Sequence, residues 1–468
     1  MLLKASSQSL TDQLAARFGE RIRNRLLAPG ARLPSVRQCA EQQGVSPSTV
    51  VAAYDQLLAQ GLVEARKNRG FFVREAAPQE GAPGRPQRRA STRGPAPVDA
   101  TSLIRGMFHR ASNKPQPGMG VFPTEWLETT FLSTAVRKVT NTQALHAFSL
   151  QYGEPLGDAG LRRALSAKLA ALDVPAPPEH IVTTVGATHA LDIVSRTLLR
   201  PGDPVMVEEP GWAVEFARLS ALGMHLLPVP RRADGPDLQL MAKYCEVHKP
   251  KLYVSVSVFH NPTSYCLSPG SAHRLLQLAN QHDFHIVEDD TYSHIAPAHA
   301  TRLSALDGLQ RTIYVGGFAK ILAPNWRIGY VAAPEALVEP LLDTKMLTTL
   351  TTPALLEKAL AVCIEQGQLR RHCERIRTRL DLARSRSVKL ALHAGCQFVA
   401  EPAGLFGWVD TGVDTDALSQ RMLDEGYLLA PGALFHAQRK PSTLMRINFA
   451  TTQDAAFWKK YGELVKKL

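Results

Sequence analysis

A regular alternation through the last 370 or so residues of this 468-residue chain constrains its fold most strongly. Short apolar runs with the length of β-strands alternate there with longer segments of helical spacing. This pattern predicts an α/β domain with a mostly parallel sheet covered by helices, because parallel strands need long crossover connections. The expected strands are residues 181–184, 204–207, 252–258, 285–288, 312–315 and 328–332.

The loops after the first five of these strands are rich in Gly, Pro, Asn or Asp. Ligands of such sheets bind at the carboxyl ends of the strands. We therefore expect the chemistry of the large domain in these loops.

The first fifth of the chain is strongly basic. Residues 1–98 contain 15 Lys and Arg against 7 Asp and Glu, so they carry +8 of the net charge of +12. This asymmetry indicates a polyanionic partner, with nucleic acid as the first candidate. A basic solubilising tail is the alternative, but the region has the pattern of a folded domain.

Three helices and a β-hairpin are expected in this basic region, at residues 11–27, 35–43 and 47–59 and around the turn 67–70. Ser46 is placed to cap the third helix, and Pro47 occupies its first position. Helix, turn, helix and hairpin are typical of a winged helix-turn-helix, although a generic three-helix bundle fits the helices equally well.

Residues 76–98 are rich in Pro, Gly and Arg and have too few apolar residues to form a core. We predict an extended linker there. The expected organisation is a DNA-binding domain in residues 1–75, the linker in 76–98 and an α/β domain in 99–468.

Other classes of protein are disfavoured by composition. No apolar run approaches the roughly 20 residues that cross a bilayer, and residues 1–10 lack the features of a signal peptide. The six cysteines lie far apart, without metal-site or disulfide spacing. We expect a cytoplasmic protein with reduced thiols and no membrane partner.

Lys320 is the most informative single residue. It follows the apolar run at residues 313–315, and a low-dielectric setting favours the neutral amine, which condenses with an aldehyde. Arg327, seven residues later, offers a planar fork for a phosphate. Pyridoxal phosphate carries both an aldehyde and a phosphate and would suit this pair of residues. Most lysines are solvated surface groups, however, so the spacing of Lys320 and Arg327 alone is ambiguous.

Other loops add groups suited to the same ligand. Residues 186–188 form a Gly turn before a helix, which is typical of a phosphate site. Trp212 is available for ring stacking, and Asn261 offers an amide donor. The acidic run at residues 288–290, followed by Tyr292, suits a pyridine nitrogen and a ring oxygen, although a metal site or a helix cap is also possible.

Residues 10–75 resemble the winged helix-turn-helix of GntR-type transcription regulators, on the stretches 29–37, 44–50, 53–57, 61–63 and the wing glycine at 70. The resemblance implies DNA contacts by Arg32, Arg37, Ser46, Ser48 and Thr49, with the wing-tip residues Lys67 and Arg69 on phosphates. Pro47 stands where many members carry an arginine, so a bidentate contact to guanine is expected to be missing.

The order of the loop motifs in residues 100–468 resembles the fold-type I, aspartate-aminotransferase-like pyridoxal phosphate enzymes. The resemblance implies that Lys320 forms the internal aldimine and that Asp289 pairs with the pyridine nitrogen. Asn261 and Tyr292 would bind the ring oxygen, and Trp212 would stack on the ring.

The same resemblance implies a phosphate site and two further contacts. Ala187, Thr188 and Arg327 would hold the phosphate. Tyr152, in a Tyr-Gly-Glu-Pro-Leu-Gly segment, would reach the phosphate of the other subunit, which implies a homodimer. Arg446 would hold the carboxylate of an amino-acid ligand.

The chain departs from this pattern at three positions. Gly317 and Ala319 stand where family members usually carry hydroxyl residues, the first of which contacts the phosphate. Ser264 replaces the glycine of the usual Asn-Pro-Thr-Gly motif. The loss at Gly317 predicts weaker cofactor binding.

The fusion of the two domains resembles the MocR subfamily of bacterial transcription regulators. It implies a homodimer that binds pyridoxal phosphate and a double-stranded DNA operator, and that senses an amino compound or a vitamin B6 form through the Lys320 aldimine. Two alternatives stay open. One is an active aminotransferase with an appended DNA-binding domain; the other is a DNA-binding protein whose large domain serves only to dimerise.

Overall fold

The computed structural model describes residues 8–66, 69–74, 100–106, 114–140, 145–146 and 149–468. The expected linker and the wing-tip residue Lys67 fall outside these described ranges.

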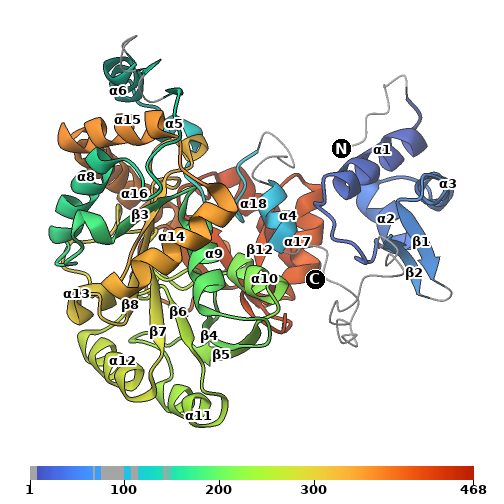
Figure 1. Ribbon diagram of the computed structural model, residues 1–468. Helices are drawn as coiled ribbons and strands as arrows, with labels where there is room; N and C mark the ends of the chain where they lie inside the picture. Colours follow the sequence, from blue (N-terminus) through green and yellow to red (C-terminus); the bar gives the residue numbers. More distant parts are fainter. Residues whose placement is uncertain (1–7, 67–68, 75–99, 107–113, 141–144, 147–148) are drawn as a thin grey trace.

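The basic N-terminal region forms a winged helix-turn-helix (Figure 1). Its elements are α1 (Leu10–Arg23), α2 (Val36–Gln43), α3 (Pro47–Ala59), and the antiparallel strands β1 (Val63–Arg66) and β2 (Gly70–Val73). Ser46 caps α3 by accepting a hydrogen bond from Thr49 N at 3.2 Å, and Gly44 ends α2 in the left-handed conformation. The sequence therefore predicted the fold and the element order of this domain correctly, although α1 ends at Arg23 and not at the expected residue 27.

The large domain is built on one mixed sheet with the strand order β3-β9-β8-β7-β6-β4-β5. The strands are β3 (Ile181–Thr184), β4 (Pro204–Glu209), β5 (His225–Pro230), β6 (Leu252–Ser255), β7 (His285–Asp289), β8 (Thr312–Gly317) and β9 (Gly329–Ala332). Strands β5, β4, β6, β7 and β8 are parallel, and only β9 is antiparallel to its neighbours β3 and β8. The mostly parallel sheet is thereby confirmed.

Helices cover both faces of this sheet (Figure 1). On one face, apolar residues of α9 (Ala187–Leu198), α10 (Ala213–Ala221) and α14 (Glu335–Thr349) pack against the strands. On the other face, α11 (Leu238–His248) and α12 (Pro269–His282) do so. The remaining helices before the C-terminal part are α4 (Ala100–Gly106), α5 (Thr124–Leu127), α6 (Phe131–Val139), α8 (Ala159–Ala170), α13 (Leu303–Asp307) and α15 (Ala354–Glu365).

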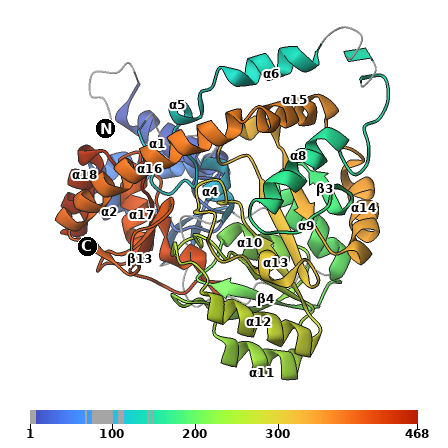
Figure 2. The ribbon, with the colours of Figure 1, turned by 90° about the vertical axis from the view of Figure 1, so that its left-hand side faces the viewer.

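A smaller α+β subdomain completes the chain. The long helix α16 (Gln368–His393) leads into it, as Figure 2 shows. A second sheet, of order β10-β11-β13-β12, contains β10 (Gln397–Phe398), β11 (Phe406–Asp410), β12 (Ala430–Pro431) and β13 (Leu444–Asn448). Helices α17 (Thr415–Asp424) and α18 (Ala455–Val465) accompany this sheet.

In the sheet of the large domain, several strand boundaries differ from the expected ones by one to three residues, and one strand was not expected. Strand β6 ends at Ser255, because the chain then turns into the loop that carries Asn261, whereas β4 runs on to Glu209. The sequence pattern missed β5, an edge strand that contains two prolines and an exposed histidine. Across the described ranges, no helix has the length and apolarity needed to span a bilayer.

Candidate functional site

Lys320 lies just after β8 and is partly buried. Its Nζ donates a hydrogen bond to the carbonyl oxygen of Gly120 at 2.7 Å. Burial is the main cause that lowers its pKa from 10.5 to about 8, and the Arg446 charge lowers it further, while Asp289 acts in the opposite direction. The amine is therefore much easier to deprotonate than an ordinary lysine.

Asp289 is the last residue of β7, which pairs with β8, so its carboxylate lies on the same edge of the sheet as Lys320. The side chain is buried, and its Oδ1 accepts hydrogen bonds from both the backbone N and the hydroxyl of Thr291. Burial raises the pKa of Asp289 to about 6, although both Thr291 hydrogen bonds lower it. A cationic group next to this carboxylate would favour its ionised form.

Arg446 reaches the site from β13 of the small subdomain and is buried. Its NH1 donates to Asn261 Oδ1 at 2.9 Å, and its NH2 donates to Gly118 O at 2.5 Å. The guanidinium lies 4.4 Å from the ring centre of Phe406, and Nε has no partner among the described residues. Burial lowers the pKa of Arg446 to about 10, and among the described residues no carboxylate forms an ion pair with this buried arginine.

Asn261 and Tyr292 are both buried in the same region. Because Asn261 uses its oxygen to accept from Arg446, its amide nitrogen remains the donor for a ligand. The Tyr292 ring packs edge-on against Phe406 with 5.6 Å between centres, and burial raises its pKa. Trp212 is half-buried at the start of α10, where the sequence placed it, directly after the loop that follows β4.

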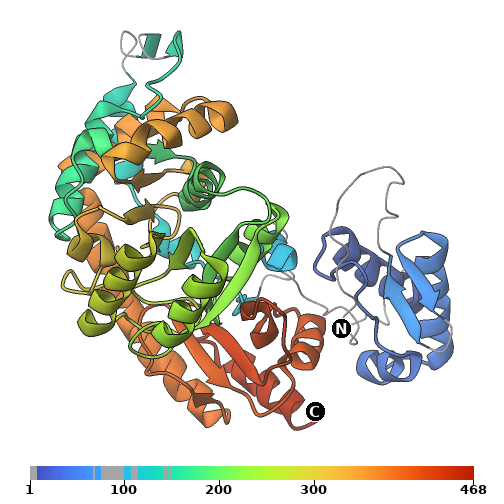
Figure 3. The ribbon, with the colours of Figure 1, turned by 60° about the horizontal axis from the view of Figure 1, so that its bottom comes forward.

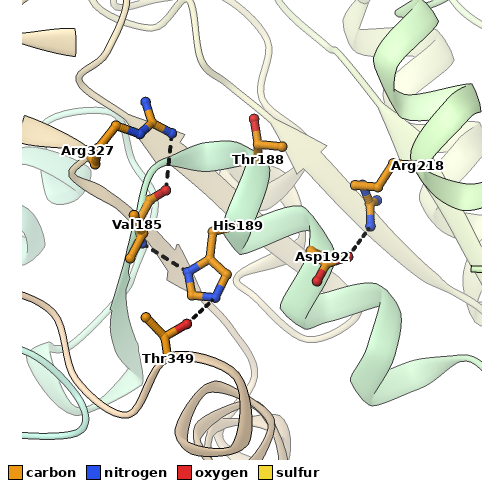
Figure 4. Close-up of a pocket in the computed structure, with 7 residues that line it drawn as sticks. All are labelled: Val185, Thr188, His189, Asp192, Arg218, Arg327 and Thr349. Atoms are coloured by element: carbon orange, nitrogen blue, oxygen red, sulfur yellow. Dashed lines mark hydrogen bonds and ion pairs between the residues drawn. The ribbon is translucent and has the colours of Figure 1, made fainter. Parts of the chain in front are cut away.

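The expected phosphate residues meet at the amino end of α9. Ala187 and Thr188 open this helix behind Gly186, whose φ of 84° suits glycine. Arg327 NH2 donates to Val185 O at 3.2 Å, which holds the guanidinium over that end (Figure 4). A cavity of about 490 Å³ opens here, lined by Val185, Thr188, His189, Asp192, Arg218, Arg327 and Thr349.

Tyr152 is not brought to the other site residues of this chain. Its side chain is 84% exposed, and within the described ranges it makes no hydrogen bond or ring contact with any of them. This exposure leaves the tyrosine free to contact a different molecule.

The expected DNA-reading residues form an exposed surface on the small domain. Ser46 and Ser48 are exposed at the start of α3, and Thr49 is half-buried beside them. The Ser46 hydroxyl lies 2.8 Å from both the Ser48 and the Thr49 hydroxyls. These side chains present a polar helix N-terminus of the kind that enters a major groove.

The expected arginines lie on the segment before α2, on α2 itself and in the turn of the wing. Arg32 and Arg37 are both exposed, as is Arg69 in the turn between β1 and β2. Arg32 lies beside the wing, because a β-carbon added to Gly70 would be 3.5 Å from its Nε. Exposed arginines thus accompany the exposed polar start of α3 on this small domain.

Comparisons with known proteins match both parts of the chain. Residues 119–457 match the family "Aminotransferase class I and II", and residues 10–73 match "Bacterial regulatory proteins, gntR family". The probable rhizopine catabolism regulatory protein MocR of Rhizobium meliloti is 31% identical over 377 residues, covering 76% of this chain and 73% of that protein. The chain belongs to the MocR-type regulators of the GntR family.

Two further similarities cover most of the fused architecture. The uncharacterized HTH-type transcriptional regulator YdcR of Escherichia coli is 29% identical over 473 residues, covering 97% of this chain and 98% of that protein. The fold of the large domain is shared with LysN, an α-aminoadipate aminotransferase of Thermus thermophilus (TM-score 0.70, 23% identity, 79% of this chain and 96% of that one). The MocR-type architecture and the fold-type I aminotransferase fold are therefore confirmed.

Aminotransferase class I and II membership implies pyridoxal phosphate as the cofactor of this MocR-type chain. The residues present fit that group. A partly buried amine, a buried carboxylate and a buried guanidinium lie together, and each lacks a direct ion-pair partner among the described residues. The aldehyde of the cofactor would bond to the amine, its pyridine nitrogen would pair with the carboxylate, and an anionic ligand would pair with the guanidinium. The amino end of α9, together with Arg327, suits the phosphate. The described residues contain no cluster of metal-ligating side chains.

Sequence reasoning missed a buried network behind Asn261. Glu208, at the end of β4, accepts a hydrogen bond from the Tyr253 hydroxyl at 3.0 Å and lies 3.3 Å from both His260 Nε2 and Arg231 Nε. Burial raises its pKa, but His260 and Arg231 outweigh that effect and hold the pKa below its ordinary value. The network fixes the loop that carries Asn261, and its signal in the sequence was the acidic pair Glu208-Glu209 directly after the expected strand 204–207.

A second missed feature is the segment 118–121. Asn448 Nδ2 donates to the carbonyl oxygens of Met119 and Val121 at 2.8 and 2.7 Å. The Gly118 carbonyl oxygen accepts a hydrogen bond from Arg446, and the Gly120 carbonyl oxygen accepts one from Lys320. Each of the four residues 118–121 is therefore hydrogen-bonded to a side chain in or next to the site. The signal in the sequence was the Gly-Met-Gly run after two prolines, which has no helical or strand pattern.

Proposed function

We propose that this chain is a homodimeric transcription regulator that binds pyridoxal phosphate through Lys320 and specific double-stranded DNA through its winged helix. An amino compound or a vitamin B6 form is the proposed effector, and its occupancy of the site changes the affinity for DNA. The proposed compartment is the cytoplasm, because a bacterial regulator acts where its DNA is.

The observation that carries this proposal is the set of buried charges in the large domain. Lys320, Asp289 and Arg446 are kept at or near one site without neutralising one another by direct ion pairs. Buried charges of this kind are costly unless a ligand pairs with them. A domain kept only for dimerisation would gain stability by losing them, which argues against the purely structural alternative.

Each residue has a proposed role that follows from its surroundings. Pyridoxal phosphate, when bound, supplies an aldehyde that bonds to amines and a ring that withdraws electrons. Lys320 offers the neutral amine for attachment, and Asp289 holds a proton on the ring nitrogen. Asn261 and Tyr292 donate to the ring oxygen, while Arg446 binds an effector carboxylate through the Nε that is now without a partner.

The proposed phosphate site includes Ala187, Thr188 and Arg327, and Trp212 is proposed to stack on the ring. A β-carbon at Gly317 would lie 3.3 Å from Ala187 N, so the missing side chain points at this end of α9. The phosphate accordingly has one hydroxyl donor fewer than a serine at this position would give. We expect a lower cofactor affinity, which suits a sensor of vitamin B6 forms.

The proposed dimer rests on an exposed apolar patch near the phosphate cavity. Leu150 and Tyr152 are 80% and 84% exposed, and Leu347 and Leu350 are 90% and 54% exposed. The two segments are neighbours, because a β-carbon at Gly153 would lie 3.4 Å from Thr352 O. A second copy of the chain would cover this patch and bring its Tyr152 to the phosphate site.

The proposed DNA contact uses Arg32, Arg37 and Arg69 with Ser46, Ser48 and Thr49; Lys67 belongs to the same proposal. Arginine contacts to phosphates make binding fall steeply with salt, and the side chains at the α3 start read base edges.

An active aminotransferase with an appended DNA-binding domain is the second candidate. The Lys320 pKa of about 8 favours it, since a general base in that range suits proton transfer near neutral pH. Relatives of this chain include the aromatic-amino-acid aminotransferase 1 of Thermococcus litoralis, at 28% identity.

One experiment separates the two candidates. DNA selected from a random library by the full chain is titrated with the protein in the presence of single amino acids, amines and vitamin B6 forms, while turnover is measured in the same samples. The proposal expects one compound to change DNA affinity with turnover far below about 1 per second. Turnover in the ordinary enzyme range without any change in DNA affinity would support the second candidate instead.

A further inference from the structure

The DNA-binding domain is held against the small C-terminal subdomain by two arginines of α1. Arg21 NH1 forms an ion pair with Asp424 Oδ1 at 2.5 Å, and Arg21 NH2 donates to Leu423 O at 2.7 Å. Arg17 donates to the Asp424 carbonyl oxygen. Figures 1 and 3 show the two parts side by side, with the first helix of the blue domain turned toward the red subdomain.

The acceptors are the carboxyl end of a helix. Asp424 is the last residue of α17, and the carbonyls of a helix's last turn have no partner within the helix and carry its negative pole. Two guanidinium groups and one carboxylate therefore meet where the helix itself favours cations. The side chains of Arg21 and Asp424 are only 11% and 12% exposed, so the pair is shielded from solvent.

Apolar packing accompanies these polar contacts. Leu14 and Phe18 of α1 belong to one continuous buried cluster with Leu423 and Leu428 of the small subdomain. The surface proposed to read DNA lies elsewhere, since Arg32, Arg37 and Ser46 remain exposed. The contact therefore orients the DNA-binding domain without covering its reading surface.

The same helix end is joined to the effector side of the site. After Asp424 the chain runs through Leu428, whose carbonyl accepts from Gly118 N at 2.8 Å, to Ala430, which pairs with Arg446 in the sheet. Gly118 O in turn accepts from Arg446 NH2 at 2.5 Å. A carboxylate bound to the Nε and NH2 fork of Arg446 would compete with Gly118 O for NH2.

We propose that the carboxyl end of α17 is the docking surface for the DNA-binding domain of this chain, and that residues 424–430 couple ligand binding at Arg446 to that docking. The coupling rests on the function proposed above, whereas the docking does not. Displacement of Gly118 from Arg446 shifts the backbone of residues 428–430. The carboxyl end of α17, to which Arg17 and Arg21 bind, moves with it. Occupancy of the site thus changes how freely the DNA-binding domain moves.

The docking is tested by hydrogen–deuterium exchange of the full chain without DNA or added ligand. Arg21→Ala and Arg23→Ala remove the same charge from the same helix, but Arg23 is exposed and forms no ion pair within the described ranges, so it is the matched control. Arg21→Ala should speed amide exchange in residues 419–428 by about tenfold or more, and Arg23→Ala should leave it unchanged. Asp424→Asn should act like Arg21→Ala from the other side of the contact.

Two readouts keep this result interpretable. Unchanged exchange in α3 shows that the DNA-binding domain is still folded in each variant. Equal exchange of residues 419–428 in Arg21→Ala, Arg23→Ala and the unmodified chain would overturn the docking.

The coupling is tested by loading cofactor-free protein with either pyridoxal phosphate or N-(5'-phosphopyridoxyl)-L-alanine, which adds a carboxylate to the same ring and phosphate. The conjugate should raise exchange in residues 419–428 severalfold over pyridoxal phosphate, and Arg446→Ala should remove the difference. Equal exchange with both ligands, or a difference that persists in Arg446→Ala, would overturn the coupling and leave the docking standing. Failure of both ligands to bind would instead contradict the proposed function and the coupling with it.

Discussion

The low pKa of Lys320 predicts how fast the protein takes up its cofactor at different pH values. With a pKa of about 8, roughly a quarter of the amine is neutral at about pH 7.5, whereas an ordinary lysine with a pKa of 10.5 is neutral in about one molecule in a thousand. The reactive fraction is therefore roughly 240 times larger. Since only the neutral amine attaches to an aldehyde, uptake should rise with pH and level off above about pH 8.

The assay mixes cofactor-free protein with pyridoxal phosphate across this pH range, stops the reaction with borohydride and quantifies the Lys320 peptide by mass spectrometry. Arg446→Ala removes the second cause of the low pKa, so the midpoint should move upward but stay below that of a free lysine, because burial remains. Arg232→Ala, an exposed arginine of the large domain, is the control and should leave the midpoint in place. An unmodified protein with a midpoint near that of a free lysine would refute the reasoning, as would an Arg446→Ala midpoint that does not rise.

Substitutions at three further positions test separate parts of the account. Ser264 has a φ of 61°, a backbone conformation that destabilises the folded state by about 1 kcal/mol for a non-glycine residue. Its hydroxyl donates a hydrogen bond to Phe406 O at 2.8 Å, which stabilises the folded state by about the same amount. Ser264→Gly should therefore leave the free energy of unfolding nearly unchanged while Ser264→Ala lowers it by about 1 kcal/mol, and equal losses in urea denaturation would be the contrary result. Gly317→Ser restores a hydroxyl beside Ala187 N and should tighten cofactor binding by about five- to tenfold; a titration showing weaker binding would mean that the side chain does not fit. Arg37→Ala should cost about 1–3 kcal/mol of specific DNA affinity and less on random DNA, and equal loss on both would reduce Arg37 to a phosphate contact.

Local signals made the fold predictable. Ser46 and Pro47 mark the start of α3 at the residue where the structure begins it, because capping and proline placement depend only on neighbouring backbone. The buried parallel strands were equally plain, since each is a short apolar run that ends in a polar loop. Strand β5 was not predicted, because it is an edge strand that contains prolines, and proline in a sequence argues against a strand.

The arrangement within the site was less accessible from sequence. Residue types and their order pointed to Lys320, Asp289 and Arg327, because Asp289 and Lys320 lie at or just after the carboxyl ends of strands and Arg327 lies just before another strand. The hydrogen bond from Arg446 to Asn261 joins residues 185 positions apart, and no local pattern records such a contact. The same holds for Glu208, whose buried partners lie on β6, in the loop after β6 and directly after β5, and for the ion pair between Arg21 and Asp424, 403 positions apart.

The central claim is that one chain couples a ligand at Lys320 to the reading of DNA. It is tested most directly by titrating the cofactor-loaded protein with a candidate amino compound while recording, in the same cuvette, the absorbance of the bound cofactor and the fluorescence anisotropy of a selected DNA. The account predicts that both signals change with the same midpoint, and that Lys320→Ala loses both responses while still binding DNA. A spectral change that is complete while DNA affinity stays constant, for every compound that alters the spectrum, would contradict it.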